Sequence, residues 1–232
     1  SYLLVAVLPL SGLAWFYLDS FESSLRTEVL VRLANIADKK SIQIDEYMEE
    51  RLSDARQLGQ QKFIHEAVAV LGKAFREGGL HTGAYRAAEQ RLRPELEKLA
   101  IRANYWDLLL MDSSGNVVFS VAREADLGTS LRSGPYRTTQ LAQGFELTKR
   151  TLQTSLTRFL PYAPSGNRPA AFLVAPVVEK GVVVGALALQ VDLSALEVVT
   201  TDNTGMGLTG ETVLAQKEGE TVLYTAPLKS RP

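Results

Sequence analysis

Two apolar, valine-rich runs within residues 170–192 constrain the fold more than any other part of this sequence. They flank a short polar break, 179–181, which ends in Gly181. Such a break predicts a hairpin, because glycine readily takes the left-handed conformation that a tight turn needs. The runs are nearly continuous in apolar residues, which predicts central strands covered on both faces. A buried helix is the alternative, but the valines, Pro176 and Gly185 favour strands.

The composition describes a globular protein and excludes several classes of site. The 232 residues are 46% hydrophobic and 22% charged, enough for one large domain or for one domain and part of another. The net charge of −1 gives no reason to expect nucleic-acid binding. The absence of cysteine excludes disulfides, a thiol nucleophile and thiolate metal sites. With only His65 and His81, we expect no histidine-rich metal site, and no pattern predicts a cofactor.

Residues 2–18 carry no charge and are suited to a membrane anchor. Their length is at the lower limit for crossing a bilayer, about 17 residues. Three aromatic residues at 15–17 stand where an interfacial belt would lie. We therefore expect a transmembrane anchor over 1–20. The alternative is a cleaved signal peptide, for which 12–14 offers a weak cleavage site.

Residues 21–62 predict one long amphipathic helix, the spine of the protein. This stretch contains no proline, and forty helical residues span about 60 Å. The helix could pack its apolar stripe on its own domain or on a second copy, and the stripe has too little leucine to indicate a coiled coil. The stripe consists of Phe21, Leu25, Val29, Leu33, Ile36, Ile44, Met48, Leu52, Ala55 and Leu58.

Two shorter helices and a sheet are predicted after the spine. The helices cover 63–75 and 84–104, and Pro94 inside the second predicts a kink or a restart. Strands follow at 105–112 and 117–121, with turn residues between them. A helix beginning at 133–135 and a strand at 154–162 then lead to the 170–192 hairpin. This order is typical of an α+β fold, an antiparallel sheet with helices on one side.

The chain after residue 198 predicts the start of a second, related unit. Two short strands at 211–216 and 221–225 echo the first hairpin, and the unit is cut off by the end of the sequence. The resulting domains are an anchor, 1–20, a helical spine, 21–62, a first module, 63–198, and the start of a second module, 199–232.

Four stretches carry a resemblance to a known family. Residues 105–121 look like the first hairpin of its sensor domains, and 123–131 are similar to the loop that follows. Residues 159–165 are similar to the stretch before the last hairpin, and 207–214 look like the entry to a second module. The family that this chain resembles is the double Cache, PAS-like sensor region of bacterial transmembrane receptors. One position departs from it, since Arg158 stands where relatives often have an acidic residue.

The resemblance implies an extracytoplasmic sensor of the bacterial inner membrane, anchored by a helix at each end. In this family the sensor feeds a cytoplasmic output such as a chemotaxis signalling domain, a histidine kinase or a nucleotide cyclase. None of these outputs lies within the sequence. The partners expected are therefore the membrane, a small-molecule ligand and a second copy of the chain in a homodimer.

In such a fold the ligand would lie between the sheet face and the loop and helix that cover it. Arginine can hold a carboxylate, aspartate can accept from an ammonium group, and aromatic side chains can form walls. Residues 134–137 are expected to open the covering element, with Arg137 in a partly dry cleft and Asp192 as the opposite charge. An amino acid or another carboxylate would satisfy both. The candidate ligand-binding residues are Trp106, Tyr136, Arg137, Arg158, Tyr162 and Asp192.

Other interpretations of these residues stay open. Tyr136 and Tyr162 could be packing residues, with the charged candidates facing solvent. Glu124 and Asp126 are expected to be solvated or capping residues of the loop before Gly128. No paired carboxylates, nucleophile–histidine arrangement or phosphate loop is recognisable, so we expect no enzyme in this segment. The alternatives to a ligand sensor are a protein-interaction or dimerisation module and, more weakly, a membrane-anchored enzyme.

Overall fold

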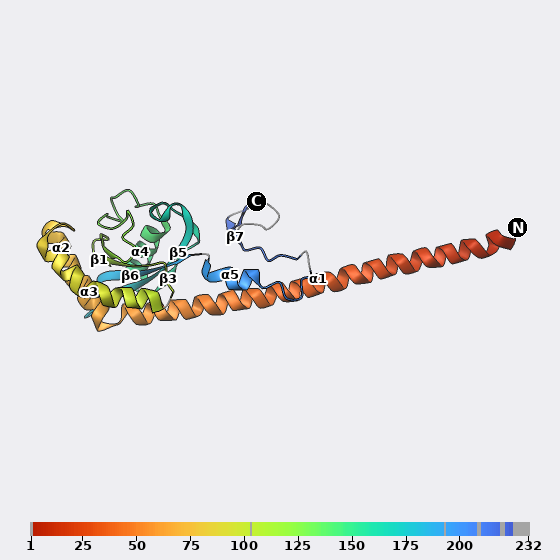
Figure 1. Cartoon of the computed structure of the whole chain (residues 1–232), viewed down its shortest axis with the longest axis horizontal. Coiled ribbons are helices and arrows are strands. Elements are labelled where there is room, and N and C mark those ends of the chain that lie inside the picture. The colour runs from red at the N-terminus through yellow and green to blue at the C-terminus, as the bar shows by residue number, and fades with distance from the viewer. Residues whose placement is uncertain (1, 103, 193, 208–209, 219–220, 225–232) are drawn as a thin grey trace.

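The computed structural model describes residues 2–102, 104–192, 194–207, 210–218 and 221–224, with side chains from 10 to 215 except 192, 195, 197 and 198. A rod-like helix carries a compact module near its C-terminal end (Figure 1). The helices are α1 Tyr2–Gly59, α2 Lys62–Gly78, α3 Gly83–Arg102, α4 Gln140–Thr151, the 3-10 helix η1 Ala163–Ser165 and α5 Ser194–Thr201. The strands are β1 Asp107–Asp112, β2 Val117–Ser120, β3 Ser155–Leu156, β4 Leu160–Tyr162, β5 Arg168–Glu179, β6 Val182–Asp192, β7 Ala215–Glu218 and β8 Thr221–Tyr224.

The predicted spine is confirmed as an unbroken helix that ends at Gly59. A Cβ atom at Gly59 would lie 3.0 Å from the Cβ atom of Ala175, so the glycine allows the end of α1 to approach β5 closely. The predicted anchor falls partly on residues 1–9, whose side chains are outside the described part of the chain. Across the residues that are described, no helix combines the length and the apolar character needed to cross a bilayer.

The 170–192 hairpin is confirmed as the centre of the sheet. The strands run in the order β2-β1-β6-β5-β3, with β4 also pairing with β5, and every pair is antiparallel. The turn between β5 and β6 places Lys180 at φ 50° and Gly181 at φ 79°. Two successive left-handed residues give the tight turn that suits the twist of a hairpin.

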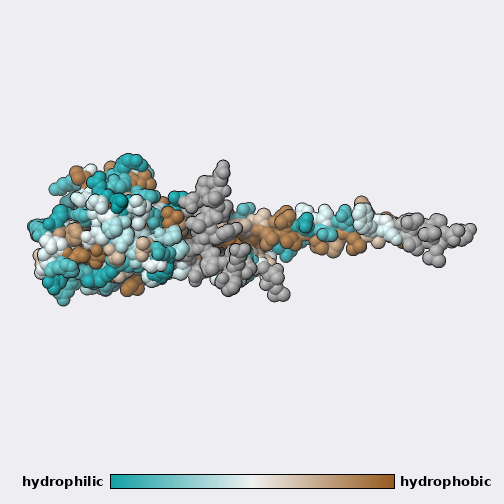
Figure 2. Space-filling model, turned by 90° about the horizontal axis from the view of Figure 1, so that it is seen from above, coloured by the Kyte–Doolittle hydropathy of each residue, from teal (hydrophilic) through white to brown (hydrophobic). Residues whose placement is uncertain are grey.

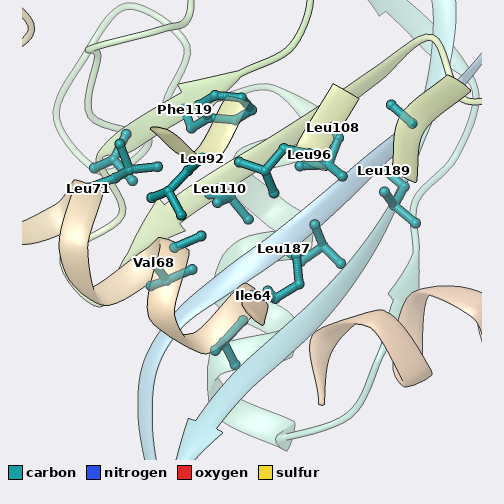
Figure 3. Close-up of a cluster of buried hydrophobic side chains, with 14 of the residues drawn as sticks. Ile64, Val68, Leu71, Leu92, Leu96, Leu108, Leu110, Phe119, Leu187 and Leu189 are labelled. Carbon is teal, nitrogen blue, oxygen red and sulfur yellow. The ribbon is translucent and has the colours of Figure 1, made fainter. Parts of the chain in front are cut away.

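Helices cover both faces of this sheet, which corrects the prediction of helices on one side. On one face α2, α3 and the C-terminal part of α1 enclose a core that includes Ile64, Leu96, Leu108 and Leu187 (Figure 3). On the other face α4 and the loop after β2 enclose a second core, in which Phe145 is fully buried. The physical reason lies in β5 and β6, whose continuous apolar runs leave neither face free for solvent.

Several local features differ from the predictions. Residues 133–135 form turns, and α4 begins only at Gln140, where the Thr139 hydroxyl caps the helix by accepting from the backbone N–H of Ala142. The predicted strand 154–162 is divided into β3 and β4. Helix α3 continues through Pro94, so no restart occurs.

The C-terminal part adds one helix that the sequence did not predict. Helix α5 follows β6 and lies beside α1, and Lys40 of α1 donates to the carbonyl oxygens of Val199 and Asp202. Beyond it β7 pairs with β8, which confirms a hairpin, although β7 begins at Ala215 and not at residue 211. The assignment of this hairpin to a second module stays a prediction.

Candidate functional site

A group of polar side chains is buried on the sheet face beneath α4 and the loop after β2. Asp107 of β1 and Gln190 of β6 are direct cross-strand partners, and both side chains are at most 1% exposed. They share this face with Leu109 and Ala188, since successive residues of a strand alternate between faces. Two polar residues thus point into an otherwise apolar core. We call the group formed by Asp107, Glu124, Asp126, Tyr162, Ser165 and Gln190 the acidic cluster.

Asp126 and Tyr162 form the most buried contact of the acidic cluster. The Tyr162 hydroxyl donates to Asp126 Oδ2 at 2.5 Å, and neither residue is exposed. The second carboxylate oxygen, Asp126 Oδ1, is buried and has no hydrogen-bond partner among the described residues. Burial raises the pKa of the Asp126 carboxyl, and burial together with the neighbouring Asp126 charge raises the pKa of the Tyr162 hydroxyl.

Glu124 connects the covering loop to η1 and to the start of β1. Its two carboxylate oxygens accept from Ser165 Oγ at 2.5 Å and from Trp106 Nε1 at 3.1 Å. Gln190 Nε2 donates to Ser165 Oγ at 2.9 Å, which leaves Gln190 Oε1 buried without a described partner. The Arg168 guanidinium stacks 3.6 Å from the centroid of the Trp106 ring, a short cation–π distance.

Asp107 closes the other end of the acidic cluster. It accepts from Ser120 Oγ at 2.7 Å and from the backbone N–H groups of Val121 at 2.8 Å and Ala122 at 3.0 Å. These bonds favour the ionised form, yet burial outweighs them and raises the pKa of Asp107 to about 7. The charge of Asp126 raises this pKa further. The carboxyl group is therefore about half protonated at neutral pH.

The charges of the site do not balance. Three carboxyl groups, those of Asp107, Glu124 and Asp126, face one nearby guanidinium, that of the exposed Arg168. The neighbouring Arg123 pairs with Glu89 at 2.7 Å, on the side of α3. Within the described part of the chain, no three or more His, Cys, Asp or Glu side chains are arranged so that they could hold a metal ion. The arrangement is thus an acceptor-rich, negatively charged site for hydrogen-bond donors.

Only some of the six residues predicted to bind ligand lie at the acidic cluster. Trp106 and Tyr162 take part in the contacts above, and Tyr136 is half-buried against the same core. Arg137 is exposed and donates to the carbonyl oxygen of Gly134, outside the buried contacts of the cluster. Arg158 is exposed and lines a separate hollow of about 190 Å³ beside α4. The side chain of Asp192 lies outside the described residues.

The expectation for the two loop acids was wrong. Asp126 is fully buried, whereas Glu124 is half-buried and accepts with both carboxylate oxygens from side chains of other segments. The loop folds down onto the sheet, and the hydroxyl, indole and amide donors there replace water. Asp107 and Gln190 were missed, although each is a polar residue on the face beneath α4 of a mostly apolar strand.

Comparisons with known proteins bear on the fold. No family model matches this chain, and no curated protein sequence matches it. Among solved structures, the sensor domain of the histidine kinase DctB from V. cholerae matches with a TM-score of 0.54 at 19% identity, over 71% of this chain and 56% of that one. The ligand-binding domain of the Pseudomonas fluorescens chemoreceptor CtaA with L-serine gives 0.48 at 15%, over 72% and 61%. That of the Pseudomonas aeruginosa chemoreceptor PctC with GABA gives 0.48 at 15%, over 75% and 66%.

The DctB comparison shows that this chain has the fold of a bacterial sensor domain. It confirms the α+β, PAS-like architecture that the sequence resemblance implied. The chain spans between about half and two thirds of the length of the three solved structures named above.

Proposed function

We propose that this chain is the extracytoplasmic ligand-sensing region of a bacterial transmembrane receptor. It binds a small molecule on the sheet face beneath α4 and passes a conformational signal to a cytoplasmic output domain. The observation that carries this proposal is the acidic cluster, where Asp126 Oδ1 and Gln190 Oε1 are buried acceptors without a described partner. Unsatisfied buried polar atoms cost stability, so they indicate a site that awaits donors. The sensor-domain fold supports the same function.

The ligand-contacting residues include the six that the sequence predicted. Tyr162 belongs to the acidic cluster, Trp106 donates to its Glu124, and Tyr136 packs beside it. Arg137, Arg158 and Asp192 remain proposed ligand contacts from the sequence. An amino acid or another carboxylate is the ligand class they suggest, and the two chemoreceptor domains named above are complexes with L-serine and GABA.

A thermal-shift screen of the purified chain against small metabolites tests ligand sensing. A ligand that binds only the folded state raises the melting temperature in proportion to the logarithm of its concentration. We expect at least one metabolite to do so, and Trp106→Ala to abolish the shift, while Trp15→Ala on the exposed part of α1 leaves it intact. A screen without any shift would favour an interaction module. No catalytic activity is proposed for this segment.

The proposal places residues 1–20 in the bacterial inner membrane and the rest outside the cytoplasm. It is supported by the uncharged N-terminal stretch, which continues without a break into the spine. A reporter fused at residue 150 tests this placement. Activity of an extracytoplasmic reporter is expected, whereas activity of a cytoplasmic one would contradict it.

A second candidate function, homodimerisation, is favoured by one observation on α1. Its apolar stripe is uncovered towards the N-terminus, where Phe21, Leu25, Val29 and Leu33 are 63%, 45%, 52% and 39% exposed. Figure 2 shows hydrophobic side chains along the rod beyond the module. A second copy packed along α1 would bury this stripe, at about 25 cal/mol per Å² of apolar surface. Sedimentation velocity distinguishes a dimer from a monomer.

A further inference from the structure

The buried acceptors of the acidic cluster that have no described partner indicate which kind of ligand could bind there. Gln190 Oε1, and Asp126 Oδ1 when its carboxyl is ionised, can only accept hydrogen bonds. The amide nitrogen of Gln190 and the hydroxyls of Tyr162 and Ser165 are already used as donors within the cluster. Among these groups, only the second N–H of the Gln190 amide remains to donate to a ligand that brings further acceptors. A ligand with several N–H donors could donate a hydrogen bond to each of the two acceptors.

The charge of the site indicates the same ligand. Asp107, Glu124 and Asp126 lie close enough that the Asp126 charge raises the pKa of Asp107 and the Glu124 charge raises that of Asp126. Mutual repulsion of buried carboxylates is relieved by a cation placed among them. A carboxylate ligand would add a further negative charge beside these carboxyl groups in a region of low dielectric, where like charges repel strongly.

We infer that the acidic cluster binds the protonated amino group of a primary alkylamine without a carboxylate, held by Asp126 Oδ1 and Gln190 Oε1. This inference rests on the proposed sensing function, but it replaces the amino acid or carboxylate suggested there with an amine that carries no carboxylate. An ammonium group has three N–H donors and one positive charge, which matches two free acceptors and an excess of carboxylates. Leu109, Ala188 and Phe172 give the cluster apolar surroundings, which strengthen a charged contact by excluding water.

A metal ion is the other cation that acidic residues attract, but the geometry does not favour one. Asp107 points its oxygens at a hydroxyl and two backbone N–H groups, and Glu124 uses both oxygens for Ser165 and Trp106. The carboxylates therefore do not converge on one point, in agreement with the lack of a metal-ligating group within the described residues. An ammonium group needs only single oxygens at hydrogen-bond distance.

The test is a matched four-carbon series measured by thermal shift and calorimetry on the purified chain. The probes are butylamine, 1,4-diaminobutane, γ-aminobutyrate, butyramide and butyrate at neutral pH, where the amines are protonated. Butylamine or 1,4-diaminobutane should bind more tightly than the zwitterion, and butyrate and butyramide should not bind. Asp126→Asn should weaken amine binding about 30-fold or more, which corresponds to about 2 kcal/mol for removing one partner of a buried charged contact.

Asp112→Asn is the matched control, because it removes an equally buried carboxylate from β1, on the sheet face opposite to that of Asp107. It should leave amine affinity unchanged. If Asp126→Asn does not fold, Gln190→Leu removes the other free acceptor and should weaken the same binding. Preferential binding of butyrate or γ-aminobutyrate overturns the inference about amines but leaves the sensing function standing. Absence of amine binding, with or without a metabolite found in the wider screen, also overturns it.

Discussion

Replacing Asp107 by asparagine should change how stability depends on pH. The Asp107 carboxyl is fully buried, and burial raises its pKa from the ordinary 3.8 to about 7. In the unfolded chain the same group returns to its ordinary pKa. Asparagine keeps an oxygen for the N–H groups of Val121 and Ala122 and directs its amide towards Ser120. The variant therefore preserves shape and most hydrogen bonds but removes the titration.

The sign and size follow from proton linkage. Between pH 4 and pH 7 the folded state holds a proton on Asp107 that the unfolded state has lost, so the free energy of unfolding falls as pH rises. The stabilising effect of the protonated group is complete below the unfolded pKa and is lost as pH rises through the folded pKa. A pKa difference of about 3, at about 1.4 kcal/mol for each, amounts to about 4 kcal/mol.

Urea unfolding of both proteins across about pH 4 to pH 8 measures this effect. The free energy of unfolding of Asp107→Asn minus that of the parent should increase with pH by about 4 kcal/mol and then level off. Ser120→Ala is the control, because it removes a hydrogen bond of Asp107 but keeps the carboxyl group, so its pH dependence should persist. A difference between Asp107→Asn and the parent that does not vary with pH would refute the assignment.

Three further substitutions test the fold and the surfaces around the site. Gly185→Ala should destabilise by about 1–3 kcal/mol in thermal unfolding, since the new Cβ would lie 2.3 Å from the Met111 carbonyl oxygen, and an unchanged melting temperature would contradict this close packing. Tyr162→Phe should cost about 1–3 kcal/mol, because Asp126 Oδ2 loses its donor, and the loss should shrink at low pH, where the carboxyl is protonated. Leu33→Asp should leave the melting temperature of a monomer nearly unchanged but abolish dimers in sedimentation velocity. If dimers persist, the apolar stripe of α1 is not their interface.

The sequence predicted the framework well because the framework depends on local periodicity. The 170–192 hairpin and the first two strands follow from apolar runs and turn residues that are contiguous in the chain. The acidic cluster depends instead on contacts between distant segments, such as that between Asp126 and Tyr162, 36 residues apart. Acidic residues in a loop are usually solvated, and only the path of the loop over the sheet reveals that Asp126 is buried.

The cluster also carries a cost that packing alone does not explain. An apolar side chain at position 107 would avoid the burial of a carboxyl group, and the same holds at position 126. Proteins place such groups where a ligand or a reaction uses them. The raised pKa of Asp107 reflects the cost of burying its ionised form on this face of the sheet.

Two adjacent residues connect this site with the spine. Trp106 directs its indole N–H to Glu124 in the acidic cluster. Tyr105, its neighbour, is buried in the core of the opposite face, where the Arg51 guanidinium of α1 lies 5.7 Å from the centroid of its ring. Because the two side chains share one short backbone segment, a ligand that displaces Trp106 also acts on the packing of Tyr105 against α1. A ligand that binds the acidic cluster is therefore expected to alter α1, the helix that leads towards the proposed membrane anchor.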